Sequence, residues 1–179
     1  MWKLAALLAA LMFALAPPAA AKPRTLVPVD EAARDPDLAA LIATLLKACD
    51  EKDFKPFEAA MSPDAIASFG GDSGPAGFRT VYRIDDPDSP FWDDFRTALL
   101  MGGAFVEDGL FAAPYVYANW PEDIDAFEYV VAIGERTTLY ARPDAASKAL
   151  AEVTHQFLEL RGDGADGDLP DGWTRVSAG

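Results

Sequence analysis

The sequence predicts an α+β protein, with a mainly helical N-terminal domain that contains a short hairpin, followed by a small all-β barrel. Apolar residues recur at helical spacing in the first half of the chain. Several short β-branched and aromatic segments, separated by turn residues, fill the last third. A short acidic segment, 121–125, separates the region of helical spacing from the region of short strand-like segments. We therefore expect the helical domain to span 37–121 and the all-β domain to span 127–179.

The first 21 residues are typical of a secretory signal peptide. Lys3 precedes an apolar stretch that ends at two prolines, and the small side chains of 19–21 complete the pattern that signal peptidase needs. An uncleaved membrane anchor is the alternative, but an anchor needs about 20 apolar residues without a break. We expect cleavage after Ala21, no stable membrane insertion after that cleavage, and a periplasmic or secreted location.

The charge and the cysteine count restrict the possible partners. The chain has 15 basic and 29 acidic residues, a net charge of -14. A field of that sign repels phosphate backbones, which excludes nucleic acid as a partner. The one cysteine, Cys49, forms no intramolecular disulfide and shares a helical apolar face with Leu38, Leu41, Ile42 and Leu45. We expect it to be a buried structural thiol rather than a nucleophile.

Local signals place the N-terminal elements. Prolines in 22–36 predict an extended leader, and a helix should follow from Asp37 to Asp50. A short second helix should contain Phe54 to Met61, with a proline in its first turn. Glycine, serine and aspartate in 68–77 predict a loop. The next segment, 78–84, fits either a helix or a strand, and we favour the helix.

Strong start and stop signals follow. Ser89 and Pro90 should open a helix that Gly102-Gly103 closes, and Asp108-Gly109 predicts a hairpin turn. We expect 110–120 to be extended. In that conformation Tyr115 and Tyr117 would share one face of a strand, and Trp120 would lie on the other.

The last third should hold five strands, with His155 at the turn between two of them. The expected strands are Phe127–Ile133, Arg136–Ala141, Leu150–Val153, Gln156–Leu160 and Trp173–Ser177.

This last third resembles a bacterial SH3-like domain. The stretches "TLYARPDAASKALAEV", "QFLEL" and "GWTRV" follow the order of that family's motifs. The matching positions are Leu139, Arg142, Pro143, Ser147, Gly172, Trp173 and Val176, while Ala141 stands where the family usually has valine. The resemblance implies a small barrel that recognises a cell-envelope glycan, a peptide or a periplasmic protein, and peptidoglycan is a candidate through it.

The chain ends where such modules usually continue into another strand. We therefore expect an incomplete barrel with an open edge, which a segment of the same chain could complete. The extended segment 110–118 is the candidate for this role. A strand supplied by a partner protein is the alternative.

No catalytic, metal-binding or cofactor motif is visible. His155 has no flanking nucleophile motif, and the spacing of Asp163, Asp166, Asp168 and Asp171 does not match a calcium loop. The candidate ligand-binding residues are aromatic: Tyr115, Tyr117, Trp120, Tyr140 and Trp173. Stacking on a sugar or a peptide is one interpretation of the first three, and packing between domains is the other. Peptide recognition and core packing are the alternatives for Tyr140 and Trp173. The sequence favours a non-enzymatic binding protein over a small enzyme with a pocket in the helical domain.

Overall fold

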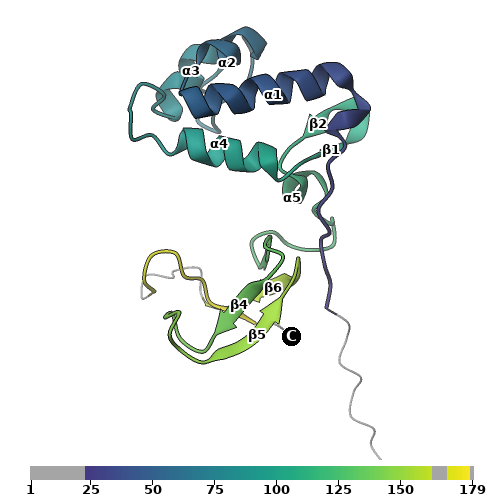
Figure 1. Cartoon of the computed structure of the whole chain (residues 1–179), viewed down its shortest axis with the longest axis vertical. Coiled ribbons are helices and arrows are strands. Elements are labelled where there is room, and N and C mark those ends of the chain that lie inside the picture. Colours follow the sequence, from purple (N-terminus) through teal and green to yellow (C-terminus); the bar gives the residue numbers. More distant parts are fainter. Residues whose placement is uncertain (1–22, 163–168, 178–179) are drawn as a thin grey trace, which may run out of the picture.

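The computed structural model describes residues 23–162 and 169–177 and shows a mixture of helices and strands, in agreement with the predicted α+β class. We use three names for its regions. From here on the leader is 23–30, which is part of the predicted leader 22–36. The helical part is 31–128, and the strand part is 129–162 and 169–177. The leader runs along one side of the molecule, from the helical part to the strand part (Figure 1). The predicted signal peptide and the acidic positions Asp163, Asp166 and Asp168 lie outside the described residues.

The longest helix, α1 (Pro36–Glu51), confirms the predicted first helix to within a residue at each end. It starts where the carboxylate of Asp35 accepts hydrogen bonds from the amides of Asp37 and Leu38, with a proline in the first turn. It ends at Lys52, which has a left-handed backbone conformation. Cys49 is buried on its inner face, as predicted, and this burial raises the pKa of the thiol.

Three further helices follow: α2 (Lys55–Ala60), α3 (Gly74–Val81) and α4 (Phe91–Leu100). Helices α2 and α4 pack with α1, and Phe78 of α3 packs against the core that they share. The favoured helix at 78–84 is thus present, but it begins inside the predicted loop, since Pro75 fits the first turn of a helix. The predicted start of α4 is correct to within a residue or two, because the hydroxyl of Ser89 accepts a hydrogen bond from the amide of Phe91 at 3.3 Å.

The core of the helical part is aromatic. Phe57 lies within it, and four ring centroids lie 5.1 to 6.1 Å from its own: those of Phe54, Phe91, Trp92 and Phe95. Three of these four contacts are edge-to-face, an arrangement that aromatic rings prefer. Cys49 and Ile84 fill the remaining space in the same buried cluster.

The predicted hairpin at Asp108-Gly109 is confirmed. It consists of β1 (Ala104–Phe105) and β2 (Phe111–Ala112), which pair antiparallel around a short 3-10 turn. The prediction of an extended 110–120 is wrong, because only β2 is a strand there and Tyr115–Ala118 forms the short helix α5. The helical turn places Tyr115 in the core and Tyr117 in solvent, so the two tyrosines do not share a face.

The strand part contains five strands at the predicted places, each differing from its predicted limits by up to three residues. They are β3 (Tyr129–Val131), β4 (Thr137–Tyr140), β5 (Ala149–Val153), β6 (Phe157–Leu160) and β7 (Val176–Ser177). His155 lies in the turn between β5 and β6, as expected.

The described residues form small sheets and no closed barrel, so the SH3-like barrel itself stays a prediction. The strands form two separate sheets, β3-β6-β7 and β4-β5, and both are antiparallel. The barrel stays open because no ladder of hydrogen bonds among the described residues joins β3 to β4, and because β7 contributes only two residues.

The leader pairs with β6, which the sequence did not indicate. The amide of Leu26 donates to the carbonyl of His155 at 2.7 Å, and the amide of Phe157 donates to the carbonyl of Arg24 at 2.9 Å. The Arg24 guanidinium also donates to both carboxylate oxygens of Asp123, at 2.6 Å each. We call this set of contacts the clasp. The segment 110–118, expected to complete the edge of the strand part, pairs with β1 instead.

The pattern of hydrogen bonds shows which edge of β6 the leader occupies. The backbone groups of Gln156 and Leu160 bond to the β3 side. Those of His155 and Phe157 bond to the leader, and the amide of Arg161 bonds to the carbonyl of Arg175 just before β7. Since alternate residues of a strand bond to opposite neighbours, the leader and β7 share one edge of β6, end to end.

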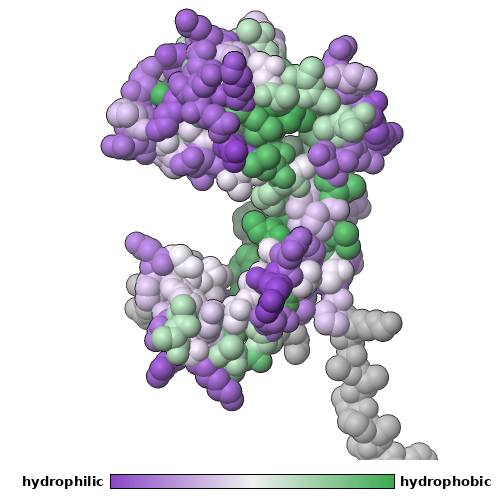
Figure 2. Space-filling view, in the orientation of Figure 1, coloured by the Kyte–Doolittle hydropathy of each residue, from purple (hydrophilic) through white to green (hydrophobic). Residues whose placement is uncertain are grey.

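A hydrophobic cluster joins the two parts beneath the clasp. Its buried members are Leu26, Tyr115, Ile124 and Phe157, with Trp120 packed against them. Figure 2 shows apolar residues gathered where the two parts meet, and a wide notch between the parts on the side away from the leader. In the described chain, no helix has the length and apolar character needed to cross a bilayer.

Candidate functional site: an open groove in the strand part

Two of the five candidate aromatic residues, Tyr115 and Trp120, pack in the hydrophobic cluster that joins the two parts. Tyr115 is 2% exposed, and its hydroxyl has no hydrogen-bond partner among the described residues. Burial raises its pKa. The indole nitrogen of Trp120 donates to the carbonyl of Ile124 at 2.8 Å, and its ring packs edge-to-face on Phe157 at 5.1 Å. Both side chains therefore fill the cluster that joins the two parts.

Tyr117 lies apart from the other candidates. It projects from α5 and is 79% exposed. Because the helical turn separates it from Tyr115, the tyrosine ladder expected from the sequence does not form. Tyr117 is nonetheless useful below, as an exposed aromatic outside the groove.

The structure brings the remaining two candidates together. Tyr140 at the end of β4 and Trp173 before β7 are far apart in sequence, yet their ring centroids lie 5.8 Å apart with an interplanar angle of 75°. Both line a groove of about 770 Å³ between the β3-β6-β7 sheet and the β4-β5 hairpin. Both are only half-buried, so parts of the two rings remain accessible from solvent.

The groove combines an apolar lining with a charged rim. Leu139 and Leu158 are among its apolar residues, and Leu158 belongs to the small buried core of the strand part. Arg142 and Arg175, both exposed, also line it. Neither forms an ion pair with another described residue, whereas Arg136 and Arg161 in the same part are paired with glutamates.

Sequence reasoning did not select Arg142 and Arg175 as site residues. A signal for them exists, because each arginine stands two positions after one of the groove aromatics: Tyr140-x-Arg142 and Trp173-x-Arg175. The spacing indicates a shared site only when the fold shows that both segments line one groove.

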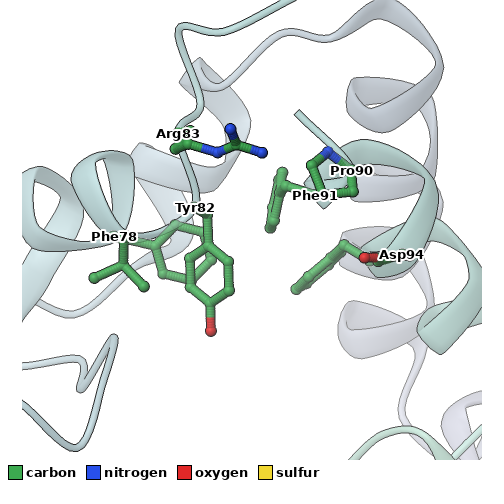
Figure 3. Close-up of a pocket in the computed structure, with 8 residues that line it drawn as sticks. Phe78, Tyr82, Arg83, Pro90, Phe91 and Asp94 are labelled. Carbon is green, nitrogen blue, oxygen red and sulfur yellow. The ribbon is translucent and has the colours of Figure 1, made fainter. Parts of the chain in front are cut away.

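A second hollow, of about 500 Å³, lies on the helical part between α3 and α4. Figure 3 shows Phe78, Tyr82 and Phe91 around it, with Arg83 on one side and Asp94 on another. The ring centroids of Tyr82 and Phe91 are 5.5 Å apart. The Arg83 guanidinium lies 3.5 Å from a carboxylate oxygen of Asp86. The described residues that line this hollow include no serine, cysteine or histidine.

Neither Cys49 nor His155 is among the described residues that line the two hollows. Cys49 is buried in the aromatic core of the helical part. His155 is half-buried, and its Nδ1 has no hydrogen-bond partner among the described residues. A catalytic histidine needs such a partner to orient its ring. Nor does the described part of the chain gather three or more histidine, cysteine or acidic side chains in a way that could hold a metal ion.

Comparison with protein families, with curated proteins and with solved structures finds no match for this chain. The functional argument therefore depends on the residues of the groove and of the second hollow.

Proposed function

We propose that the chain is an exported, non-enzymatic binding protein, periplasmic or secreted, whose SH3-like C-terminal module recognises a ligand or protein of the cell envelope. The observation that carries this proposal is the open groove that holds Tyr140 and Trp173 in contact. Binding sites are typically apolar hollows of about 300 to 1,000 Å³ with a few polar groups at fixed positions. The groove has this size and this composition.

An NMR titration of the mature chain with soluble peptidoglycan fragments tests the proposal. We expect the amide signals of Tyr140 and Trp173 to shift and the Trp173→Ala variant to lose the shifts. The matched control is Tyr117→Ala, because Tyr117 is exposed but lies on α5 rather than in the groove. Equal binding by the Trp173→Ala variant and the parent chain would place the ligand site elsewhere.

Export is part of the same proposal and has its own test. The sequence of the first 21 residues predicts that the exported protein begins at Lys22. The intact mass of protein isolated from the periplasm or the medium measures this directly. Recovery of a membrane-bound chain that still carries Met1 would contradict it.

A small enzyme with its pocket in the helical part is the second candidate, and the hollow beside Tyr82 and Asp94 is the observation that favours it. A fragment library screened by NMR separates the two candidates. Fragments that shift the signals of Tyr82 and Phe91 and leave Trp173 unchanged would favour the pocket. Shifts confined to the strand part would favour the binding module.

A further inference from the structure

The charge of the protein is distributed unevenly between its two parts. The helical part has 20 acidic and 7 basic residues, a net charge of -13. Residues 129–179, which include the strand part, have 8 acidic and 5 basic residues, a net charge of -3. The groove thus lies in the part of the protein with the much smaller negative charge, which repels an anion less than the helical part does.

The two groove arginines are held in place through their backbones. The hydroxyl of Ser147 donates to the carbonyl of Arg142 at 3.1 Å and accepts from its amide at 3.3 Å. The carbonyl of Arg175 accepts from the amide of Arg161 at 2.9 Å. A guanidinium on a fixed backbone loses less conformational freedom when it binds a carboxylate, and its fork of donors matches the two carboxylate oxygens.

The strands that line the groove also have unpaired edges. Both β3 and β4 line it, and among the described residues β3 pairs only with β6 and β4 only with β5. Each strand therefore has a second edge without a described strand partner, and an edge of that kind can accept an extended peptide. Tyr140 and Trp173 meet at 75°, so they do not form one flat platform for a sugar ring. Edge groups and crossed rings together favour a peptide over a glycan.

Building on the proposed function, we infer that the groove binds an extended acidic segment of a partner protein. Carboxylates of the segment pair with Arg142 and Arg175, its backbone bonds to an open edge of β3 or β4, and a side chain between the carboxylates packs on Tyr140 and Trp173. Peptide recognition by addition to a strand edge gains affinity from the backbone and selectivity from the side chains. In this groove the two arginines would make binding selective for segments with negatively charged side chains.

The test uses the mature chain and a synthetic peptide of about eight residues in which glutamate alternates with threonine, a residue that favours extended structure. The same peptide with glutamine in place of glutamate is the control ligand. Dissociation constants are measured by NMR from the Tyr140 and Trp173 signals at low and high salt. We expect the glutamate peptide to bind about tenfold more tightly at low salt, because hydrogen bonds to charged groups are the stronger ones.

Variants of the arginines assign the charge effect to the groove. Arg142→Gln and Arg175→Gln should each weaken binding of the glutamate peptide about tenfold, since each removes one charged hydrogen-bonding partner. Arg142→Lys should weaken it less, because lysine keeps the charge but loses the fork of donors. The matched control is Arg136→Gln, which removes the same charge from a residue that is paired with Glu152 and does not line the groove. It should leave the affinity within about twofold. Circular dichroism melts verify that each variant is folded.

Each other outcome overturns a defined part of the inference. Equal binding of the two peptides, unaffected by Arg142→Gln and Arg175→Gln, would reject the acidic ligand and leave the proposed groove function intact. Shifts at Trp173 caused by peptidoglycan fragments but not by the glutamate peptide would reject the peptide and support the glycan. Self-association that Arg175→Gln abolishes would identify a second copy of this acidic chain as the occupant. Absence of groove shifts with peptide and with glycan would reject the proposed function as well.

Discussion

The helical part and the strand part are stabilised in different ways. In the helical part, aromatic rings pack on one another in a single cluster, and the buried side chains of Phe54, Phe57, Phe91 and Trp92 account for most of its volume. The buried core of the strand part is small, with Ala132, Val153 and Leu158 at its centre. The helical part supplies its own stability. The strand part has an open groove beside this small core.

The two parts also differ in charge, and the candidate binding groove lies in the less acidic part. The acidic residues are concentrated on the helical part, where they favour solubility, and the C-terminal region 129–179 has a much smaller net charge of -3. A thin core weakens a fold on its own, but it suits a site that must admit a ligand. The clasp and the cluster beneath it tie this less stable part to the helical part.

The largest expected effect tests the contrast between the two cores. Phe57→Ala should lower the free energy of unfolding by about 3–5 kcal/mol, because it removes a ring with four aromatic neighbours and leaves a cavity. Leu158→Ala, the matched change in the strand part, should cost about 2–3 kcal/mol, at the low end of the range for such truncations, because a thin core beside an open groove collapses more easily. Urea unfolding measures both values. A larger loss for Leu158→Ala would contradict the contrast.

A smaller effect tests whether the leader stabilises the strand part. Leu26→Ala should cost about 2 kcal/mol, because Leu26 is 7% exposed and packs in the cluster with Tyr115 and Phe157. Hydrogen exchange should become faster at the Phe157 amide and stay unchanged in α1. The control is Val27→Ala at the adjacent position, where the side chain is 69% exposed. Uniformly faster exchange in both parts would show that the leader stabilises the whole molecule rather than the strand part.

The smallest expected effect is a pH dependence of the clasp. The hydrogen bond from Arg24 holds the pKa of the Asp123 carboxyl below its ordinary value of 3.8. A carboxyl with a lowered pKa in the folded state contributes stability above its ordinary pKa and loses that contribution as the pH falls through the folded value. Protection of the Leu26 amide should therefore decrease between about pH 5 and about pH 3 in the parent chain.

Asp123→Asn should remove this acid dependence and lower the protection of Leu26 slightly at neutral pH, since the pair is exposed and screened. Glu122→Gln changes the neighbouring exposed carboxylate and serves as the control. An unchanged acid dependence in Asp123→Asn would assign the effect to another carboxylate.

Local signals in the sequence account for most of the elements but not for their assembly. Ser89 and Pro90 mark the start of α4 correctly, because capping is a property of adjacent residues. The segment 110–120 was predicted wrongly because its alternation of aromatic and small residues fits a strand. Its conformation instead follows from burying Tyr115 against distant residues such as Leu26. Contacts of that kind have no signature in the neighbouring sequence.

The candidate site was predictable to a similar extent. Tyr140 and Trp173 were selected through the resemblance of the last third to a known module, and the structure places them on one groove. Arg142 and Arg175 required the fold, because only the arrangement of β4 and β7 around one groove connects the two arginines. The placement of Tyr115 and Trp120 in the core depends on the leader, whose pairing with β6 involves residues near opposite ends of the chain.

The clasp has a consequence for the order of folding. Thr25 bridges to Gln156, so the leader has no partner in the strand part until nearly the whole chain has been synthesised. Contacts of such large sequence separation carry a high loop-closure entropy and form late. The local contacts of the helical part form early by comparison, and during that interval Leu26 stays exposed to solvent. Burial of Leu26 therefore reports that the polypeptide has been completed beyond Phe157, and a chain truncated before that point should display an apolar strand that chaperones and proteases can recognise.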